Sequence, residues 1–234
     1  MQPLAQTGVL ALWERGANRH ALDRTALLCA WARPDLPADS IADLPLGTVT
    51  ADLLRLREAS FGPRIDSRVD CAHCGAALEL SLACAELLQP CEPQAEVEVA
   101  GLRLRAPSLR DLASVADERD ADHAARRILA RCTLQQEADA EALDDVALRA
   151  CEEALDTLDP NADIALSLRC EACGEHGSAQ LDIGVLLWDE IETYARRLLQ
   201  DVHALASAYG WTEGEILSLG TARRERYLAM VGAR

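Results

Sequence analysis

The sequence of 234 residues contains no lysine, so all 23 of its Lys and Arg positions are arginine. A lysine amine is required for Schiff-base enzymes, for pyridoxal enzymes and for the conventional P-loop, so these three classes are excluded. The sequence also lacks a Gly-x-Ser-x-Gly elbow, a His-Glu-x-x-His motif and a dinucleotide fingerprint. A Cys–His pair such as Cys132 with His123 would need adjacency in space and a lowered thiol pKa, which the sequence does not show. We therefore expect a protein that is not an enzyme.

Aromatic residues and positive charge are also scarce. The chain has one Phe, three Tyr and four Trp, and its formal net charge is −16. An acidic surface repels the phosphate backbone, and few aromatic rings are available to stack on bases, so we expect no nucleic-acid partner. The sequence shows no secretory h-region and no apolar run of transmembrane length, so we expect no membrane partner and a cytoplasmic location.

Cysteine, in contrast, is plentiful and patterned. The motif CxxCG occurs twice, as Cys71-Ala-His-Cys74-Gly75 and as Cys170-Glu-Ala-Cys173-Gly174. Each copy lies between two runs in which apolar and polar residues alternate, and alternation is typical of a half-buried strand. The glycine after the second cysteine can adopt the backbone angles of a tight turn. Each copy therefore predicts a strand, a cysteine knuckle and a second strand.

Four thiolates from two such knuckles are the ligands of a tetrahedral structural zinc site with no open position for a substrate. We predict one Zn²⁺ ion bound by Cys71, Cys74, Cys170 and Cys173. The alternatives are two separate redox pairs or cysteines that pack in a core, but redox pairs normally begin a helix after a strand. His73 and His176 lie in or beside the knuckles and could replace a thiolate, although four cysteines are already available.

The remaining five of the nine cysteines have no local signature of a nucleophile, and without a secretory segment a disulfide framework is not expected. We interpret them as small buried residues or surface thiols: Cys29, Cys84, Cys91, Cys132 and Cys151.

The 95 residues between the knuckles exceed the loop of a compact zinc ribbon, so we interpret the chain as one discontinuous ribbon that brackets an inserted domain. The predicted fold class is α+β. Its segments are an N-terminal helical segment (1–62), the first half of the ribbon (63–95), an inserted hairpin and helical domain (96–159), the second half of the ribbon (160–186) and a C-terminal helical arm (187–234).

Local signals refine these segments. Thr50 is predicted to cap a helix that ends at Gly62, and Ser108 to cap one with Asp111 in its first turn. Residues 90–93 predict a stiff linker, residues 96–105 a hairpin, and residues 121–134 and 141–158 two helices. The acidic run from 137 to 145 is interpreted as a solvated loop and helix start.

The C-terminal arm has the most regular pattern. A long helix from Trp188 to Tyr209 carries apolar residues at alternating spacings of three and four, which is typical of a helix-packing seam. Gly210 ends it, and Thr212 with Glu215 forms a capping box. Arginines in the last helix indicate either intramolecular ion pairs or docking onto an acidic partner. The predicted partner-binding residues are Trp188, Leu198, Val202, Leu205, Tyr209, Trp211, Arg223, Arg224 and Tyr227.

Several of these runs resemble a family encoded with contractile phage tails and extracellular contractile injection systems, usually named for the baseplate hub assembly chaperone. In the arm, the resemblance rests on Trp188-Asp-Glu-Ile, Val202-His-Ala-Leu-Ala206, Tyr209-Gly-Trp211, Ile216-Leu217, Arg223-Arg224 and Tyr227-Leu228. Elsewhere it rests on Trp13-Glu14, Leu53-Leu54, Phe61-Gly62, Pro107 with Asp111-Leu112, and Asp159-Pro160 before the second CxxCG.

The resemblance implies a non-enzymatic assembly factor or minor structural component of a baseplate, with hub or other baseplate proteins as partners. It also implies that the protein can be incorporated into an assembled phage tail-like particle. The alternative is a zinc ribbon that binds nucleic acid or acts in transcription, which predicts basic and aromatic side chains on the ribbon. The ribbon flanks instead carry Glu79, Glu86, Glu171, Glu175 and Asp182.

Overall fold

The computed structural model describes residues 3–90, 95–135 and 143–232. Two predictions therefore lie wholly or mostly outside the described residues, namely the stiff linker at 90–93 and the acidic run from 137 to 145. The described part combines helices with three small antiparallel hairpins, which makes it a mixed helical and β structure.

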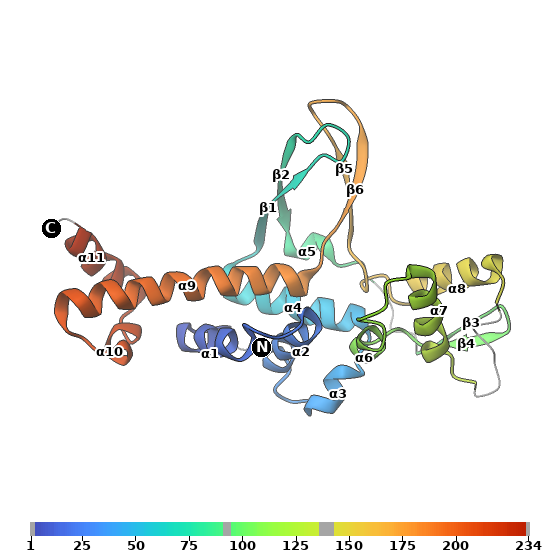
Figure 1. The fold of residues 1–234 in the computed structure, drawn as a ribbon, viewed down its shortest axis with the longest axis horizontal. Helices are drawn as coiled ribbons and strands as arrows, with labels where there is room; N and C mark the ends of the chain where they lie inside the picture. Colours follow the sequence, from blue (N-terminus) through green and yellow to red (C-terminus); the bar gives the residue numbers. More distant parts are fainter. Residues whose placement is uncertain (1–2, 91–94, 136–142, 233–234) are drawn as a thin grey trace.

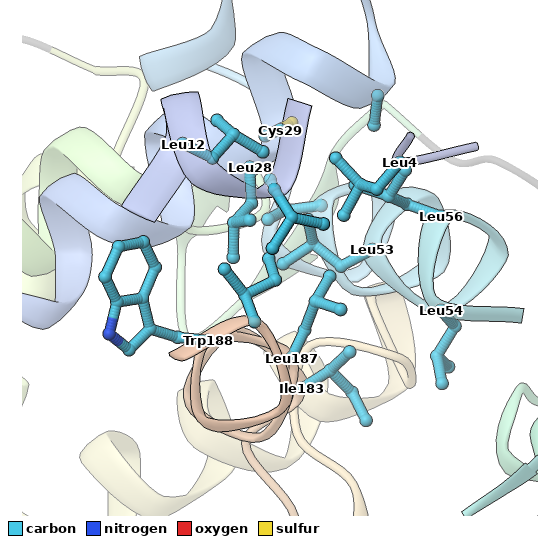
Figure 2. Close-up of a cluster of buried hydrophobic side chains, with 14 of the residues drawn as sticks. Leu4, Leu12, Leu28, Cys29, Leu53, Leu54, Leu56, Ile183, Leu187 and Trp188 are labelled. Atoms are coloured by element: carbon cyan, nitrogen blue, oxygen red, sulfur yellow. The ribbon is translucent and has the colours of Figure 1, made fainter. Parts of the chain in front are cut away.

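A helical body forms the centre of the molecule. It consists of α1 (Gln6–Gly16), α2 (Ala21–Ala32) and α4 (Leu46–Phe61), which pack along the first half of the long helix α9 (Ile183–Tyr209), and of the short helix α3 (Ala38–Ala42), which packs against α2. Figure 2 shows leucines of these helices, among them Leu12, Leu28, Leu53 and Leu187, pointing into one shared apolar core. Because distant parts of the chain contribute to this core, it fixes the start of α9 against the N-terminal helices.

Two boundaries of the body differ from the sequence predictions. The α4 helix begins at Leu46 directly after Pro45, so Thr50 lies inside the helix and the prediction that it caps the helix is wrong. Proline is favoured at the start of a helix because its missing N–H is not needed there. The α9 helix begins at Ile183, five residues before Trp188, because the side chain of Asp182 accepts a hydrogen bond from the Val185 amide and caps the helix.

Two β-hairpins project from this body side by side (Figure 1). The first pairs β1 (Arg64–Asp70) with β2 (Ala77–Ala83), and the second pairs β5 (Ala165–Arg169) with β6 (His176–Gln180). We call these two hairpins with their turns, residues 64–83 and 165–180, the prong. Both strand–knuckle–strand predictions are confirmed, and both CxxCG motifs lie in the turns at the far end of the prong.

The base of the prong is joined to the body. Ile65 is buried in the main core, and Leu82 and Leu166 pack against it. The short helix α5 (Cys84–Leu87) follows β2. Arg57 of α4 is buried and donates hydrogen bonds to Glu190 of α9 and to the carbonyl of Gly62 just before β1. One guanidinium therefore connects two helices of the body to the start of the first hairpin.

The segment between the hairpins forms a smaller unit with its own apolar cluster. It contains β3 (Val97–Val99), β4 (Leu102–Leu104), α6 (Leu109–Ala113), α7 (Ala121–Cys132) and α8 (Asp145–Leu158). The hairpin prediction is confirmed, and so is the cap at Ser108, whose backbone N–H and hydroxyl both donate to Asp111. Its buried cluster consists of Leu102, Leu104, Leu129, Leu148 and Cys151.

Polar contacts tie the two ends of this segment together. The side-chain oxygen of Asn161 accepts from the Gln89 amide at 2.7 Å, and its amide donates to the Gln89 carbonyl at 3.0 Å. The neighbouring Asp159 carboxylate accepts from the Gly47 amide at 2.8 Å. The outgoing and returning chain thus meet beside α4, and this places the two hairpins next to each other.

The chain ends in two helices beside the distal half of α9, namely α10 (Glu213–Leu217) and α11 (Thr221–Gly232). Gly210 ends α9 with a φ of 69°, in the left-handed region that glycine favours. The predicted capping box of Thr212 and Glu215 is confirmed. Within the described ranges, no helix combines the length and apolar character needed to cross a membrane.

Candidate metal centre

The two cysteine turns have the same backbone geometry. In the first, the Cys71 amide donates to the Ala76 carbonyl and the Gly75 amide donates to the Cys71 carbonyl, each at 2.8 Å. In the second, Cys170 and Gly174 make the equivalent bonds at 2.9 and 2.8 Å. Gly75 and Gly174 have φ values of 72° and 77°, which a residue with a Cβ adopts at a cost. This explains why both motifs carry glycine after the second cysteine.

These turns bring together four sulfur atoms from positions about a hundred residues apart. The Sγ atoms of Cys71 and Cys173 are 3.8 Å apart, those of Cys74 and Cys170 are 3.7 Å apart, and all four lie within 4.8 Å of one another. Sulfurs about 2.3 Å from a common tetrahedral centre would be separated by about 3.8 Å. A disulfide would require about 2.05 Å, and all four are free thiols. The spacing therefore fits ligands of one metal ion.

The electrostatics of the four thiols also favour a cation. The backbone amides of Cys74 and His73 hydrogen-bond to the sulfur of Cys71 and lower its pKa to about 6. The Glu175 amide favours the thiolate of Cys173, but loss of water around it and hydrogen bonding to the other sulfurs raise its pKa to about 12. Without a cation, Cys71 ionises readily, whereas the pKa values of Cys74 and Cys173 are raised and both resist a second negative charge. A divalent ion would neutralise this repulsion and hold all four as thiolates.

The candidate metal ligands are the four cysteines. Among the described residues, the group of His, Cys, Asp and Glu side chains close enough to hold an ion consists of the four cysteines alone. His73 and His176 are exposed. A site filled by four thiolates leaves no position for a reacting molecule, so the arrangement suits a structural metal and not a catalytic one.

The other described cysteines are buried away from the cluster, as one of the two sequence interpretations expected. Cys29, Cys84, Cys132 and Cys151 are all buried. Burial raises the pKa of Cys29 to about 11 and that of Cys132 to about 12, so both are neutral thiols at physiological pH. Cys91 lies outside the described residues.

The predicted partner-binding residues divide into two groups. Trp188, Leu198 and Leu205 are buried against the chain itself, with at most 2% of each residue exposed. Arg224 is also buried, and it donates to Asp201 at 3.1 Å and to Gln6. Trp188 and Leu198 belong to the main core, and Arg224 joins the C-terminal helix to α1, so these side chains serve packing within the chain. They do not form part of an exposed surface in this structure.

The second group is accessible. Val202, Tyr209, Trp211 and Tyr227 are half-buried, and Arg223 is exposed. The rings of Tyr209 and Trp211 stack at 4.7 Å, and Tyr227 meets Trp211 edge-on at 4.9 Å. This aromatic cluster joins α9 to α11.

Sequence reasoning missed two polar residues that position the metal centre. Asn161 ties the ends of the intervening segment, and Arg57 ties the first hairpin to α9. Asn161 directly follows the pair Asp159-Pro160, which we noted only for its resemblance to the baseplate family. Nothing in the local sequence distinguishes Arg57 from the exposed arginines around it, because its partner Glu190 is 133 positions away.

Comparison with known proteins assigns the chain to a family. No curated protein and no solved structure matches it. The family model described as T4 bacteriophage base plate protein, however, matches residues 35–183. This range covers more than half of the chain and includes both hairpins, all four cysteines and the segment between them. The protein therefore belongs to the T4 bacteriophage base plate protein family.

Proposed function

We propose that this protein is a non-enzymatic, zinc-binding assembly factor or minor structural component of a contractile, phage-tail-like baseplate. The observation that carries the proposal is the combination of the family match with a closed cluster of four cysteines. A chaperone-like role in assembly of the baseplate hub is one form of the proposal. In either form the protein works by binding other baseplate proteins during particle assembly in the cytoplasm, and it can remain in the finished particle.

Zinc is the metal that the ligands favour. Soft thiolates select Zn²⁺, Cu(I) or iron–sulfur clusters, and a tetrahedral site with four thiolates is typical of structural zinc. The two glycine-containing knuckles at the ends of two hairpins support the interpretation of the prong as one zinc ribbon in two halves. Cys71, Cys74, Cys170 and Cys173 would hold the ion.

The metal would act by joining the tips of hairpins that the body joins only at their base. Structural zinc contributes an apparent binding free energy of about 10–16 kcal/mol, which is ample to order a small element. In this proposal each of the five sequence segments has its own structural role. Residues 1–62 with the start of α9 support the prong, residues 63–95 and 160–186 form it, residues 96–159 form a separate unit, and residues 187–234 form an arm for partners.

The charge of the prong supports protein contacts over the alternative of a nucleic-acid-binding ribbon. Two of its three arginines lie beside acceptors of their own chain, and the third, Arg169, is exposed. Arg64 donates to Ser81 at 2.7 Å, and Arg68 lies 3.8 Å from Asp70. Together with the net charge of −16, these contacts disfavour binding of the prong to phosphate groups.

The test has two independent parts. Purified protein should contain one zinc per chain by elemental analysis, and Cys173→Ser should lose it while His73→Ala and His176→Ala keep it. Co-expression with the hub and other baseplate proteins of the same particle should yield a complex that Arg223→Glu weakens at least about tenfold, whereas Arg149→Glu, an exposed change on α8, should not.

Two results would remove the proposal. A chain that retains zinc in Cys173→Ser would rule out the shared four-cysteine site. A chain that forms no complex with any of those baseplate proteins would remove the assembly role.

A further inference from the structure

A groove lies where the first turns of α9 meet the base of the prong. Its volume is about 650 Å³. The floor and walls include Phe61 at the end of α4, Leu181 after β6, and Val185, Leu186 and Tyr194 on α9. The groove is separate from both the four cysteines and the aromatic cluster of the C-terminal arm.

The apolar residues that line this groove are accessible. Val185 is 44% exposed, on a helix whose other face forms the main core. Phe61, the only phenylalanine of the chain, meets Tyr194 edge-on with ring centroids 6.2 Å apart. Both rings are half-buried, so part of each is available to an apolar side chain or to a cation.

Carboxylates line the groove. Asp66, Asp182, Asp189 and Glu190 contribute four negative charges, against one positive charge from Arg197. Glu190 is already paired with Arg57, and Asp182 caps α9. Asp189 is exposed and makes no ion pair or side-chain hydrogen bond within the described part of the chain. The net charge of −16 adds to the negative potential, which would steer a basic partner toward this site.

We propose that this groove binds a basic amphipathic segment of another baseplate protein. An apolar side chain of that segment would pack against Val185 and Leu186, and its arginines or lysines would face Asp189 and Asp66. The class of partner rests on the function proposed above, but the chemistry of the segment follows from the groove alone. A groove lined by accessible apolar groups and by carboxylates is complementary to such a segment and repels nucleic acid.

A direct binding measurement with the full-length, zinc-loaded protein tests this assignment. The probe is a fluorescein-labelled helical peptide of about 15 residues with leucines on one face and arginines on the other. Its counterpart has glutamate in place of every arginine. We expect saturable binding of the arginine peptide at one site by fluorescence anisotropy, and none of the glutamate peptide.

Three variants locate the site. Asp189→Arg should weaken binding at least about tenfold, and Val185→Ser should weaken it about fivefold, because each removes one of the two features of the groove. The matched control is Asp156→Arg, an equal change of charge at an exposed position of α8. It should stay within about twofold of the unmodified protein.

Each contrary result overturns the proposal in a recognisable way. Equal weakening by Asp189→Arg and Asp156→Arg would show diffuse attraction to an acidic surface. Absence of saturable binding below about 1 mM would show that the groove has no affinity for this chemistry. A dimer in sedimentation that Asp189→Arg dissociates would show that a second copy occupies the groove. None of these results alters zinc content or co-purification through the arm, so failure here is distinct from failure of the proposed function.

Discussion

The tip and the base of the prong are stabilised by different interactions. At the base, Ile65 is buried in the helical core, and Leu82 and Leu166 pack against that core. Further out, Val69, Leu78 and Leu168 are only half-buried and line a cavity of about 200 Å³ beside the cysteines. The hairpins thus meet through apolar packing at one end and through four sulfurs at the other. We therefore expect the metal site and the apolar core to be independent, so that loss of either one has a limited effect on the other.

Metal removal should produce the largest effect, and it should be confined to the prong. In the proposed zinc-bound protein, chelation removes an apparent binding free energy of about 10–16 kcal/mol, so the tips should separate and the strands should lose protection. Hydrogen exchange should become faster at residues 64–83 and 165–180, while α1, α2, α4 and the first half of α9 keep their protection.

The variant Cys71→Ser should reproduce that pattern at all zinc concentrations, and His73→Ala in the same turn should not. If chelation instead unfolded the helices together with the prong, the tip and the core would be one cooperative unit and the separation would be wrong.

The reverse experiment removes apolar volume from the core. Leu187 is fully buried at the centre of the body (Figure 2), and Leu187→Ala should lower the free energy of unfolding by about 2–5 kcal/mol. Urea unfolding followed by far-UV circular dichroism measures this change, and zinc content of the folded variant should stay at one per chain.

The control for this change lies on the same helix. Leu199 is 38% exposed, so Leu199→Ala should cost less than about 1 kcal/mol. Loss of zinc from folded Leu187→Ala would show that core packing sets the geometry of the sulfurs.

The segment between the hairpins adds a third region, stabilised by a buried charge. Asp111 is fully buried and pairs with Arg105 at 2.7 Å and with Arg131 at 2.9 Å. Burial acts to raise the pKa of Asp111, but hydrogen bonds from Arg105 and Ser108 outweigh it and hold the pKa at about 2. Because this pKa is lower in the folded than in the unfolded chain, the contribution is complete above about pH 4 and is lost as the pH falls toward 2.

At neutral pH the contribution amounts to about 2 kcal/mol. Asp111→Asn should therefore reduce stability by about that amount at pH 7 and by much less near pH 2, in urea titrations at the two pH values. Asp156→Asn, which changes an exposed carboxylate of α8, is the matched control. A loss of stability that is the same at both pH values would show that shape, and not charge, is what Asp111 contributes.

The local features of the fold and of the metal centre could be predicted from the sequence, and the contacts between distant segments could not. The alternation around each CxxCG motif and the capping pairs Ser108–Asp111 and Thr212–Glu215 depend on neighbours within a few residues. The spacing of Leu198 and Leu205 predicted a packing face, but it could not show whether the face meets a partner or the same chain. The contacts of Asn161 with Gln89, and the groove at Val185, arise only once distant segments meet.

The smallest expected effect is that of replacing the glycine in each of the two cysteine knuckles. A Cβ at Gly75 or at Gly174 would meet no atom within 4 Å, so alanine at either position is disfavoured by the left-handed backbone alone. That cost is about 1–2 kcal/mol, which corresponds to a decrease in zinc affinity of about five- to thirtyfold. Competition with a chromophoric chelator should give similar decreases for Gly75→Ala and Gly174→Ala, because the two turns share φ angles and hydrogen bonds.

The global unfolding transition of the helices should not change in either variant. A large decrease for one glycine and none for the other would mean that the knuckles are unequal, and that one of them binds the ion before the second closes onto it.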